Sequence, residues 1–271
     1  MPDYSNVKMG KKDALLKKNH LRLARYLDLS TIPEPPATVD HTRGITEWGM
    51  MLNGPNQYTD PDLTPAAVEN VREGVGLCTW AGIAHGFQVS VLSQIEDPAP
   101  KGIIHPNDGY VLGRYRESTG YDPDKPETDQ GDVLSSVLDQ ITKKDFEGRK
   151  ILGHAYVNIM DLHIVQIAIW LFCGGYCGFQ MPQAWQGADL WDMVRGNKGS
   201  PGSWGGHCIF VPKSGPDGKE GITWGANQAF TNAGFTGYGD EMWVVIFDDA
   251  VPPKGFDKDM LVADANKLAT A

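Results

Sequence analysis

Two residues stand in contexts that suit nucleophilic chemistry, and the first is Cys78. It follows Gly74 and Gly76, and small and apolar residues recur at helical spacing after it. The sequence therefore predicts that Cys78 opens a helix, where unpaired backbone N–H groups and the helix dipole favour a negatively charged thiolate. Such surroundings lower the pKa of a thiol and make it a nucleophile. The alternative is a small buried cysteine that only fills space at the start of a helix.

The second residue is His207, which follows two glycines and opens an apolar run with a strand pattern, residues 207–211. A histidine in reach of a thiol can take its proton and later return one to a leaving group. A further apolar run, residues 221–225, follows the Gly- and Pro-rich turn 214–218. The two runs are therefore expected to form a hairpin. A loop histidine without a chemical role is the alternative interpretation.

Cys78, His207 and the pair Trp224-Gly225 occur in the order used by papain-like cysteine peptidases, which the chain resembles over roughly residues 32–250. The sequence is most similar to a group of papain-like proteins of bacteria and phages. The motifs that carry this resemblance are PPATVD at 35–40, WGM at 48–50, GLCT at 76–79, GYDP at 120–123, TDQG at 128–131 and GGH at 205–207.

The resemblance implies an α+β, two-lobed fold, with an N-terminal helical lobe that carries the cysteine helix and a C-terminal antiparallel β lobe. It also implies a peptidase or amidase acting on a peptide or another amide. Cys78 would be the nucleophile and His207 the base. For such a pair we expect the Cys78 sulfur and an imidazole nitrogen of His207 within about 4 Å of each other.

Two positions depart from the papain pattern. Where the family has an asparagine that orients the histidine, this chain has Ile222, which has no polar side-chain atom. Thr223 and Asn227 are the candidate replacements. Because side chains alternate along a strand, Thr223 is expected to point away from the side of residue 222. Asn227 is accordingly the candidate third catalytic residue.

The second departure concerns the oxyanion donor. The papain-like glutamine lies six residues before the cysteine, and here that position is Arg72. Asn53 and Asn56, just after the WGM motif, are the candidate oxyanion donors. Loss of one such donor costs about 10² to 10³ in rate, so activity can survive in weakened form.

A competing function is a domain that kept the fold and lost the chemistry. It would serve as a structural or assembly component, for example of a phage particle. Both departures favour it, and so does a basic N-terminal arm suited to docking on a protein partner or on another copy of the chain. Retention of both Cys78 and His207 favours the enzyme.

Composition narrows the function classes. The chain has 271 residues and a net charge of −10, which argues against general nucleic-acid binding. We expect no membrane span, because no apolar run approaches ~20 residues, and no signal peptide, which predicts a cytoplasmic or virion location. No cofactor motif occurs. The cysteine pair Cys173 and Cys177 matches no metal or redox signature, so neither a metal nor a disulfide framework is expected.

We expect three regions: a basic amphipathic arm at 1–30, a papain-like domain at 31–250 and a tail with a short helix at 251–271. Leucines and basic residues alternate over 11–29, which predicts an amphipathic helix lying outside the lobes. The other expected helices are 65–72, 109–118, 132–143 with Asp129 as N-cap, and an apolar helix after Asp161. The expected strands are 151–158, 176–181, 207–211, 221–225 and 241–248.

Overall fold

The computed structural model describes residues 7–17, 19–49, 52–94, 106–248 and 254–269 of the 271. Helices dominate the first half of this part of the chain and strands the second, so the expected α+β class is confirmed. The α-helices are α1 (Pro65–Glu73), α2 (Cys78–Ser93), α3 (Asp108–Thr119), α4 (Leu134–Ile141), α5 (Leu162–Leu171), α6 (Asn232–Tyr238) and α7 (Lys258–Ala269).

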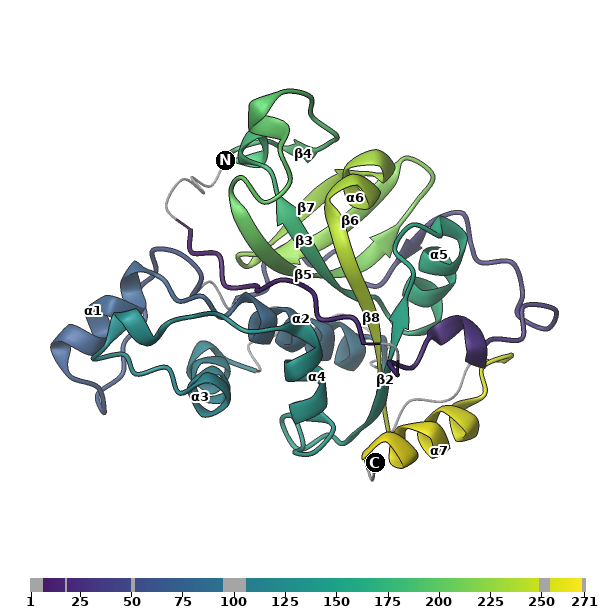
Figure 1. Ribbon diagram of the computed structural model, residues 1–271, viewed down its shortest axis with the longest axis horizontal. Helices are drawn as coiled ribbons and strands as arrows, with labels where there is room; N and C mark the ends of the chain where they lie inside the picture. Colours follow the sequence, from purple (N-terminus) through teal and green to yellow (C-terminus); the bar gives the residue numbers. More distant parts are fainter. Residues whose placement is uncertain (1–6, 18, 50–51, 95–105, 249–253, 270–271) are drawn as a thin grey trace.

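Within the described residues, the eight strands form one sheet. Its order is β2-β8-β3-β5-β6-β7-β4, with β1 paired to β5, and every pair is antiparallel except β4 with β7. Figure 1 shows α1 to α4 gathered on one side of this sheet. The strands are β1 (Val39–Asp40), β2 (Ile151–Val157), β3 (Gly175–Met181), β4 (Leu190–Trp191), β5 (Gly205–Ser214), β6 (Gly218–Thr223), β7 (Ala226–Thr231) and β8 (Gly239–Phe247).

Helix α2 is the central element and is buried along almost its whole length. Two glycines one turn apart bring it close to the sheet. A Cβ at Gly82 would lie 2.9 Å from the Cys208 sulfur, and one at Gly86 would lie 2.7 Å from the Phe210 ring. Because both neighbours are on β5, these two glycines fix the position of α2, and with it Cys78, along that strand.

Most predicted elements are confirmed, and their caps explain where they begin. Thr64 accepts the Ala67 N–H at the start of α1, and Asp161 accepts the Ile164 N–H at the start of α5. The expected cap of α4 is wrong. That helix starts at Leu134 without a side-chain cap, and Asp129 instead bonds elsewhere, as described below. Strand β7 and helix α6 were not predicted, because polar residues interrupt their apolar pattern.

The two halves have separate cores. One joins α2, α3 and α4 to the facing side of β5, β6 and β8. The other fills the opposite side of the sheet under α5 and α6, around Phe179, Trp185, Trp191 and Phe230. Within the described residues no single helix is long and apolar enough to cross a membrane; α1 and α2 pass that test only as a pair bent by 75°.

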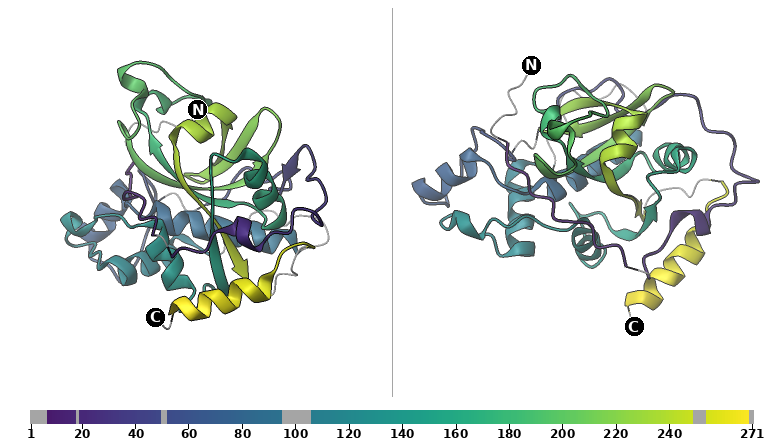
Figure 2. Two further views of the ribbon diagram at one scale, coloured as in Figure 1. Left: turned by 45° about the vertical axis from the view of Figure 1, so that its right-hand side comes forward. Right: turned by 45° about the horizontal axis from the view of Figure 1, so that its top comes forward.

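The expected amphipathic helix over residues 11–29 is wrong. The described part of this stretch contains only a short 3-10 helix, η1 (Leu23–Tyr26). Leu15 and Leu16 are exposed, so no apolar stripe packs on the domain there. Residues 7–12 are extended and run between the helices and the sheet, as the dark purple trace in Figures 1 and 2 shows. We call residues 7–12 the junction segment.

The tail carries the expected helix. Helix α7 packs on β2 and on η1, at the lower right of Figure 1. The Asp257 N–H donates to the Tyr26 carbonyl at 2.9 Å, and Arg25 pairs with Asp264 at 3.1 Å. The C-terminal helix is therefore joined to η1 as well as to the sheet.

Candidate active site

Cys78 lies at the first position of α2 and is 1% exposed. No side chain caps this helix; the Trp80 N–H donates to the Leu77 carbonyl at 2.9 Å, which leaves the N–H groups of Cys78 and Thr79 for other acceptors. Burial raises the pKa of the Cys78 thiol to about 11. Backbone hydrogen bonds from Cys208 and Gly10 act in the opposite direction. A hydrogen bond that lowers the pKa of a thiol favours the thiolate, so in both cases the N–H faces the sulfur.

His207 lies near the start of β5 and is 1% exposed. Its Nε2 is 2.7 Å from Thr223 Oγ1, and its ring stacks on Trp224 with centroids 4.5 Å apart and planes at 18°. Burial lowers the pKa of His207 to about 3, because the charged ring would lose its hydration. The Nδ1 atom is buried without a hydrogen-bond partner.

The backbone before Cys208 passes near Cys78, but the His207 ring lies with Thr223 and Trp224, on the side of the sheet away from α2. The Cys208 N–H faces the Cys78 sulfur, and His207 is the residue before it. No hydrogen bond joins the thiol to the imidazole in the described part of the chain, since His207 Nδ1 has no partner. The raised pKa of Cys78 and the lowered pKa of His207 also mean that both groups are neutral at pH 7. An approach within about 4 Å stays a prediction.

Thr223, not Asn227, contacts the histidine ring. Alternation along β6 holds as expected: Ile222 packs in the core beside α2, and Thr223 points to the other side. The ring of His207 lies on the Thr223 side. Asn227 instead accepts the Trp48 indole N–H at 2.7 Å and donates to the Ile45 carbonyl at 3.1 Å. It therefore fixes the loop that follows β1.

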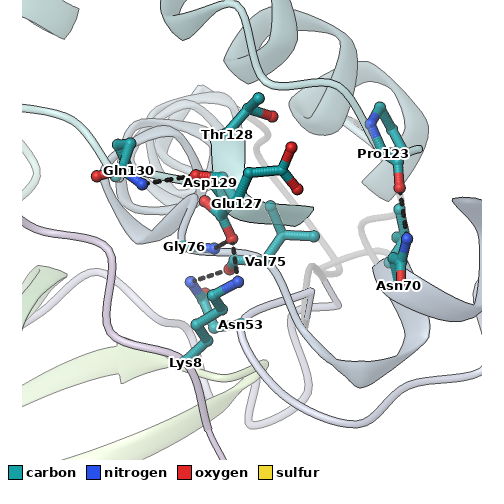
Figure 3. A network of polar contacts seen from close by, with 12 residues as sticks. Lys8, Asn53, Asn70, Val75, Gly76, Pro123, Glu127, Thr128, Asp129 and Gln130 are labelled. Carbon is teal, nitrogen blue, oxygen red and sulfur yellow. Dashed lines mark hydrogen bonds and ion pairs between the residues drawn. The ribbon is translucent and has the colours of Figure 1, made fainter. Parts of the chain in front are cut away.

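The two oxyanion candidates are engaged with backbone groups. Asn53 is buried and donates from Nδ2 to the Val75 carbonyl at 3.1 Å (Figure 3). Asn56 donates to the Val71 carbonyl at 2.9 Å and accepts the Tyr58 N–H at 2.8 Å. Arg72 donates to the Tyr58 carbonyl at 2.8 Å. These three side chains hold the loop before α1 against the end of that helix.

The junction segment is bonded to both halves of the molecule. On the helical side, the Lys8 N–H donates to the Asn53 carbonyl, the Asp132 N–H donates to the Gly10 carbonyl at 2.8 Å, and the Lys12 N–H donates to the Asp132 carbonyl at 2.9 Å. On the sheet side, the Lys11 N–H donates to the Gly206 carbonyl at 3.1 Å. Its one β-bridge joins Lys11 to Asp132 on the helical side, and a single hydrogen bond ties it to the residue that precedes His207.

Glycines make this close approach possible. A Cβ at Gly10 would lie 1.6 Å from the Gly76 carbonyl oxygen, and one at Gly131 would lie 2.0 Å from the Gly10 carbonyl oxygen. A Cβ at Gly206 would lie 2.3 Å from the Lys11 carbonyl oxygen. No side chain fits at these positions without moving the backbone, so the segment and its surroundings are matched to each other.

The junction segment passes over Cys78 at Gly10. The Gly10 N–H faces the sulfur, while the Gly10 carbonyl is bonded to Asp132 on the helical side. A nucleophilic thiolate needs a carbonyl carbon in reach. The Gly10 carbonyl is therefore held on the helical side while the segment lies over Cys78.

Charged contacts anchor the segment at two points. Lys8 pairs with Asp129 at 2.6 Å, and Asp129 also accepts the Gly76 N–H at 2.9 Å, just before α2 (Figure 3). Lys11 pairs with Asp240 at 2.8 Å. The sequence analysis missed both contacts, because it placed Lys11 on the exposed face of a helix over 11–29 and gave Lys8 no role. The signal that could have found them is Gly10, which weakens a helix at its start.

Among the described residues, no group of three or more histidine, cysteine or acidic side chains could hold a metal ion. Cys177 and Cys208 are buried, and burial raises the pKa of both thiols. His85 lies two turns after Cys78 on α2 and is buried with a hydrogen-bond partner. Its Nδ1 is 3.1 Å from Gln88 Oε1, and burial lowers its pKa to about 4.

Among proteins of known structure, the chain is similar to xylellain, a cysteine protease from Xylella fastidiosa. The two superpose with a TM-score of 0.61 over 89% of this chain and 96% of that one, at 13% sequence identity. No protein-family model matches the sequence, and no curated protein has a significantly similar sequence. At this identity the similarity concerns the fold, which is that of a papain-like cysteine protease.

Proposed function

We propose that the protein is a latent papain-like cysteine hydrolase, a peptidase or amidase in which Cys78 is the nucleophile and His207 the base. The observation that carries this proposal is the Cys78 thiol at an uncapped helix start, with Cys208 and Gly10 N–H groups directed at its sulfur. In the covered form both groups are neutral, so the enzyme is at rest.

Displacement of the junction segment is the activating step in this proposal. It would admit water to Cys78 and His207 and remove part of the burial that raises the thiol pKa and lowers the imidazole pKa. The thiol pKa would then fall and the imidazole pKa would rise, and both changes favour proton transfer from sulfur to nitrogen. The thiolate would then attack the substrate carbonyl, and His207 would protonate the leaving amine.

Within this proposal Thr223 takes the place of the orienting asparagine. Its hydroxyl lies on Nε2, which leaves Nδ1 as the atom that exchanges the proton. The backbone N–H groups of Cys78 and Thr79 are the proposed oxyanion donors, because the first residues of a helix have no intrahelical acceptor for their N–H groups. Asn53 can join them only if it leaves the Val75 carbonyl.

The test compares the full chain with Gly10→Val, in which a side chain must clash with the Gly76 carbonyl. Cleavage of fluorescently labelled casein should be near background for the wild type and rise at least about ten-fold in Gly10→Val. Cys78→Ser and His207→Ala in the Gly10→Val background should abolish it. Gly113→Ala is the control, because nothing lies within 4 Å of a Cβ at this exposed helical position.

A second candidate is the catalytically silent scaffold. The neutral thiol and the unpaired Nδ1 favour it, because neither group is poised for chemistry in the covered form. The same variants decide between the two. A folded Gly10→Val protein whose Cys78 reacts rapidly with iodoacetamide, yet cleaves no peptide or amide, would support the scaffold and refute the hydrolase.

A further inference from the structure

The Lys11 side chain is wholly buried, which is rare for a lysine. Its ammonium lies 2.8 Å from Asp240 Oδ2 and 3.6 Å from Glu241 Oε1, and it donates to the Lys12 carbonyl at 2.9 Å. The two acids stand side by side at the start of β8. Lys11 therefore reaches from the junction segment into a pocket of opposite charge.

The pocket fits the lysine side chain. A Cβ at Gly178 on β3 would lie 2.3 Å from Lys11 Cε, so the missing side chain there makes room for the lysine stem. Glu241 is 0% exposed and is fixed by the Trp243 indole N–H at 2.8 Å. Gln180 donates to Asp240 at 3.0 Å. Both carboxylates are thus oriented by neighbours on the sheet and not by Lys11 alone.

The pocket also needs a cation. Glu241 Oε1 and Asp240 Oδ1 are buried and accept no hydrogen bond. Burial is the main cause that raises the pKa of Glu241, and the Lys11 charge opposes it. Two neighbouring carboxylates without a counter-charge are poorly tolerated in such a site. Asp240 is 23% exposed, so the charged end of the pocket reaches solvent.

The pocket lies beside the candidate nucleophile. In the sheet, Gly178 pairs with Cys208 on β5 and with Glu241 on β8. The Cys208 N–H faces the Cys78 sulfur, and the Lys11 charge is close enough to lower the pKa of that thiol. A side chain in this pocket therefore belongs to a chain that passes directly over Cys78.

We infer that Gly178, Asp240 and Glu241 form a subsite that selects a basic side chain, lysine foremost, in the peptide substrate. Lys11 of the junction segment occupies this subsite in the covered form. The inference rests on the proposed hydrolase function and names its substrate class: peptides with a lysine one or two residues from the bond that is cleaved. A basic peptide would then compete with the protein's own segment for one acidic pocket.

The first experiment measures binding alone. In full-length Lys11→Ala the pocket loses its cation, so n-butylammonium chloride should raise the melting temperature by several degrees at millimolar concentration. The probe n-butanol, which has the same chain without the charge, should not. Lys12→Ala is the matched control, because Lys12 is exposed and its loss empties no pocket. Equal shifts in both variants, or none in Lys11→Ala, would overturn the subsite.

The second experiment measures selection. Peptides that differ only in lysine, norleucine or glutamate at one position are cleaved by Gly10→Val and by Gly10→Val with Glu241→Gln. The kcat/KM ratio of lysine to norleucine should be at least ten-fold in the first and fall towards one in the second. Asp240→Asn serves if Glu241→Gln does not fold. A ratio near one in Gly10→Val, or one that neither acid variant changes, contradicts the inference.

The two experiments separate the inference from the function. Butylammonium binding without cleavage of any peptide would refute the hydrolase and leave a receptor for basic side chains. Cleavage without lysine preference and without butylammonium binding would leave the hydrolase and refute the subsite.

Discussion

At the residue scale, His207 is held from two directions by its own half of the molecule. Thr223 bonds its Nε2, and Trp224 covers one face of its ring. Both residues come from the end of β6 and the turn that follows it. The contact fixes the rotation of the ring, and in the proposed mechanism the Thr223 hydroxyl accepts the Nε2 proton so that Nδ1 is free to take the thiol proton.

Thr223→Val should leave His207 Nε2 buried without a partner. We expect a loss of about 1–3 kcal/mol in the free energy of unfolding, measured by urea denaturation. Thr223→Ser keeps the hydroxyl and should lose less than about 1 kcal/mol. Nitrogen chemical shifts of the ring should show the Nε2–H tautomer in the wild type and in Thr223→Ser, and a mixture in Thr223→Val. An unchanged tautomer in Thr223→Val would show that Thr223 does not set it.

At the element scale, the junction segment is an extended chain with one isolated bridge to Asp132, and not a helix. Its backbone groups are satisfied by Asn53, Asp132 and Gly206, which replaces the i to i−4 bonds of a helix. The ion pair of Lys8 with Asp129 adds a charged anchor beside the start of α2. The segment is thus fixed by several small contributions, each of which can be weakened separately.

Lys8→Ala should let the junction segment leave Cys78 more often. Lys8 is 41% exposed, so its pair with Asp129 contributes about 0.2–1 kcal/mol, and iodoacetamide should label Cys78 up to about five-fold faster. Labelling is followed by mass spectrometry of the cysteine peptides. Raising the salt concentration to ~1 M should accelerate labelling of the wild type and not of Lys8→Ala. Lys12→Ala should label like the wild type; if it matches Lys8→Ala, net charge and not the anchor controls the segment.

At the scale of the whole molecule, His85 and His207 are buried and His154 is partly buried, with its side chain 16% exposed. Burial lowers the pKa of His85 and His154 to about 4 and that of His207 to about 3. In the unfolded chain these rings titrate at the ordinary value of 6.5. Below pH 6.5 the unfolded state therefore binds protons that the folded state does not, and stability falls with falling pH.

We expect the free energy of unfolding to drop by about 2 kcal/mol per buried histidine between pH 7 and pH 5. The loss should continue until the pH reaches the folded pKa values near 4 and 3. Urea denaturation at intervals across this range measures it. His85→Gln should make the dependence shallower, while His163→Gln should not, because His163 is exposed. Parallel curves for all three proteins would show that carboxylates, and not histidines, set the acid sensitivity.

The sequence by itself determined the α+β class, the helix that begins at Cys78 and the strand that carries His207. These follow from local patterns: glycines before an apolar helical repeat, a Gly-Gly start to an apolar run, and caps such as Thr64 and Asp161. The similarity to the fold of xylellain agrees with the class and the order of these elements.

Only the tertiary structure decided which side chain meets His207 and where residues 7–12 lie. Alternation along β6 placed Thr223 correctly, but the side of the strand on which the histidine lies depends on how β5 and β6 pair. The lysines of the junction segment have the spacing of an exposed helix face. Their positions are set by distant acids. Lys8 pairs with Asp129, more than 100 residues away in the sequence, and Lys11 pairs with Asp240, more than 200 residues away. Long-range charge pairs leave no local periodicity, so a folded chain is needed to reveal them.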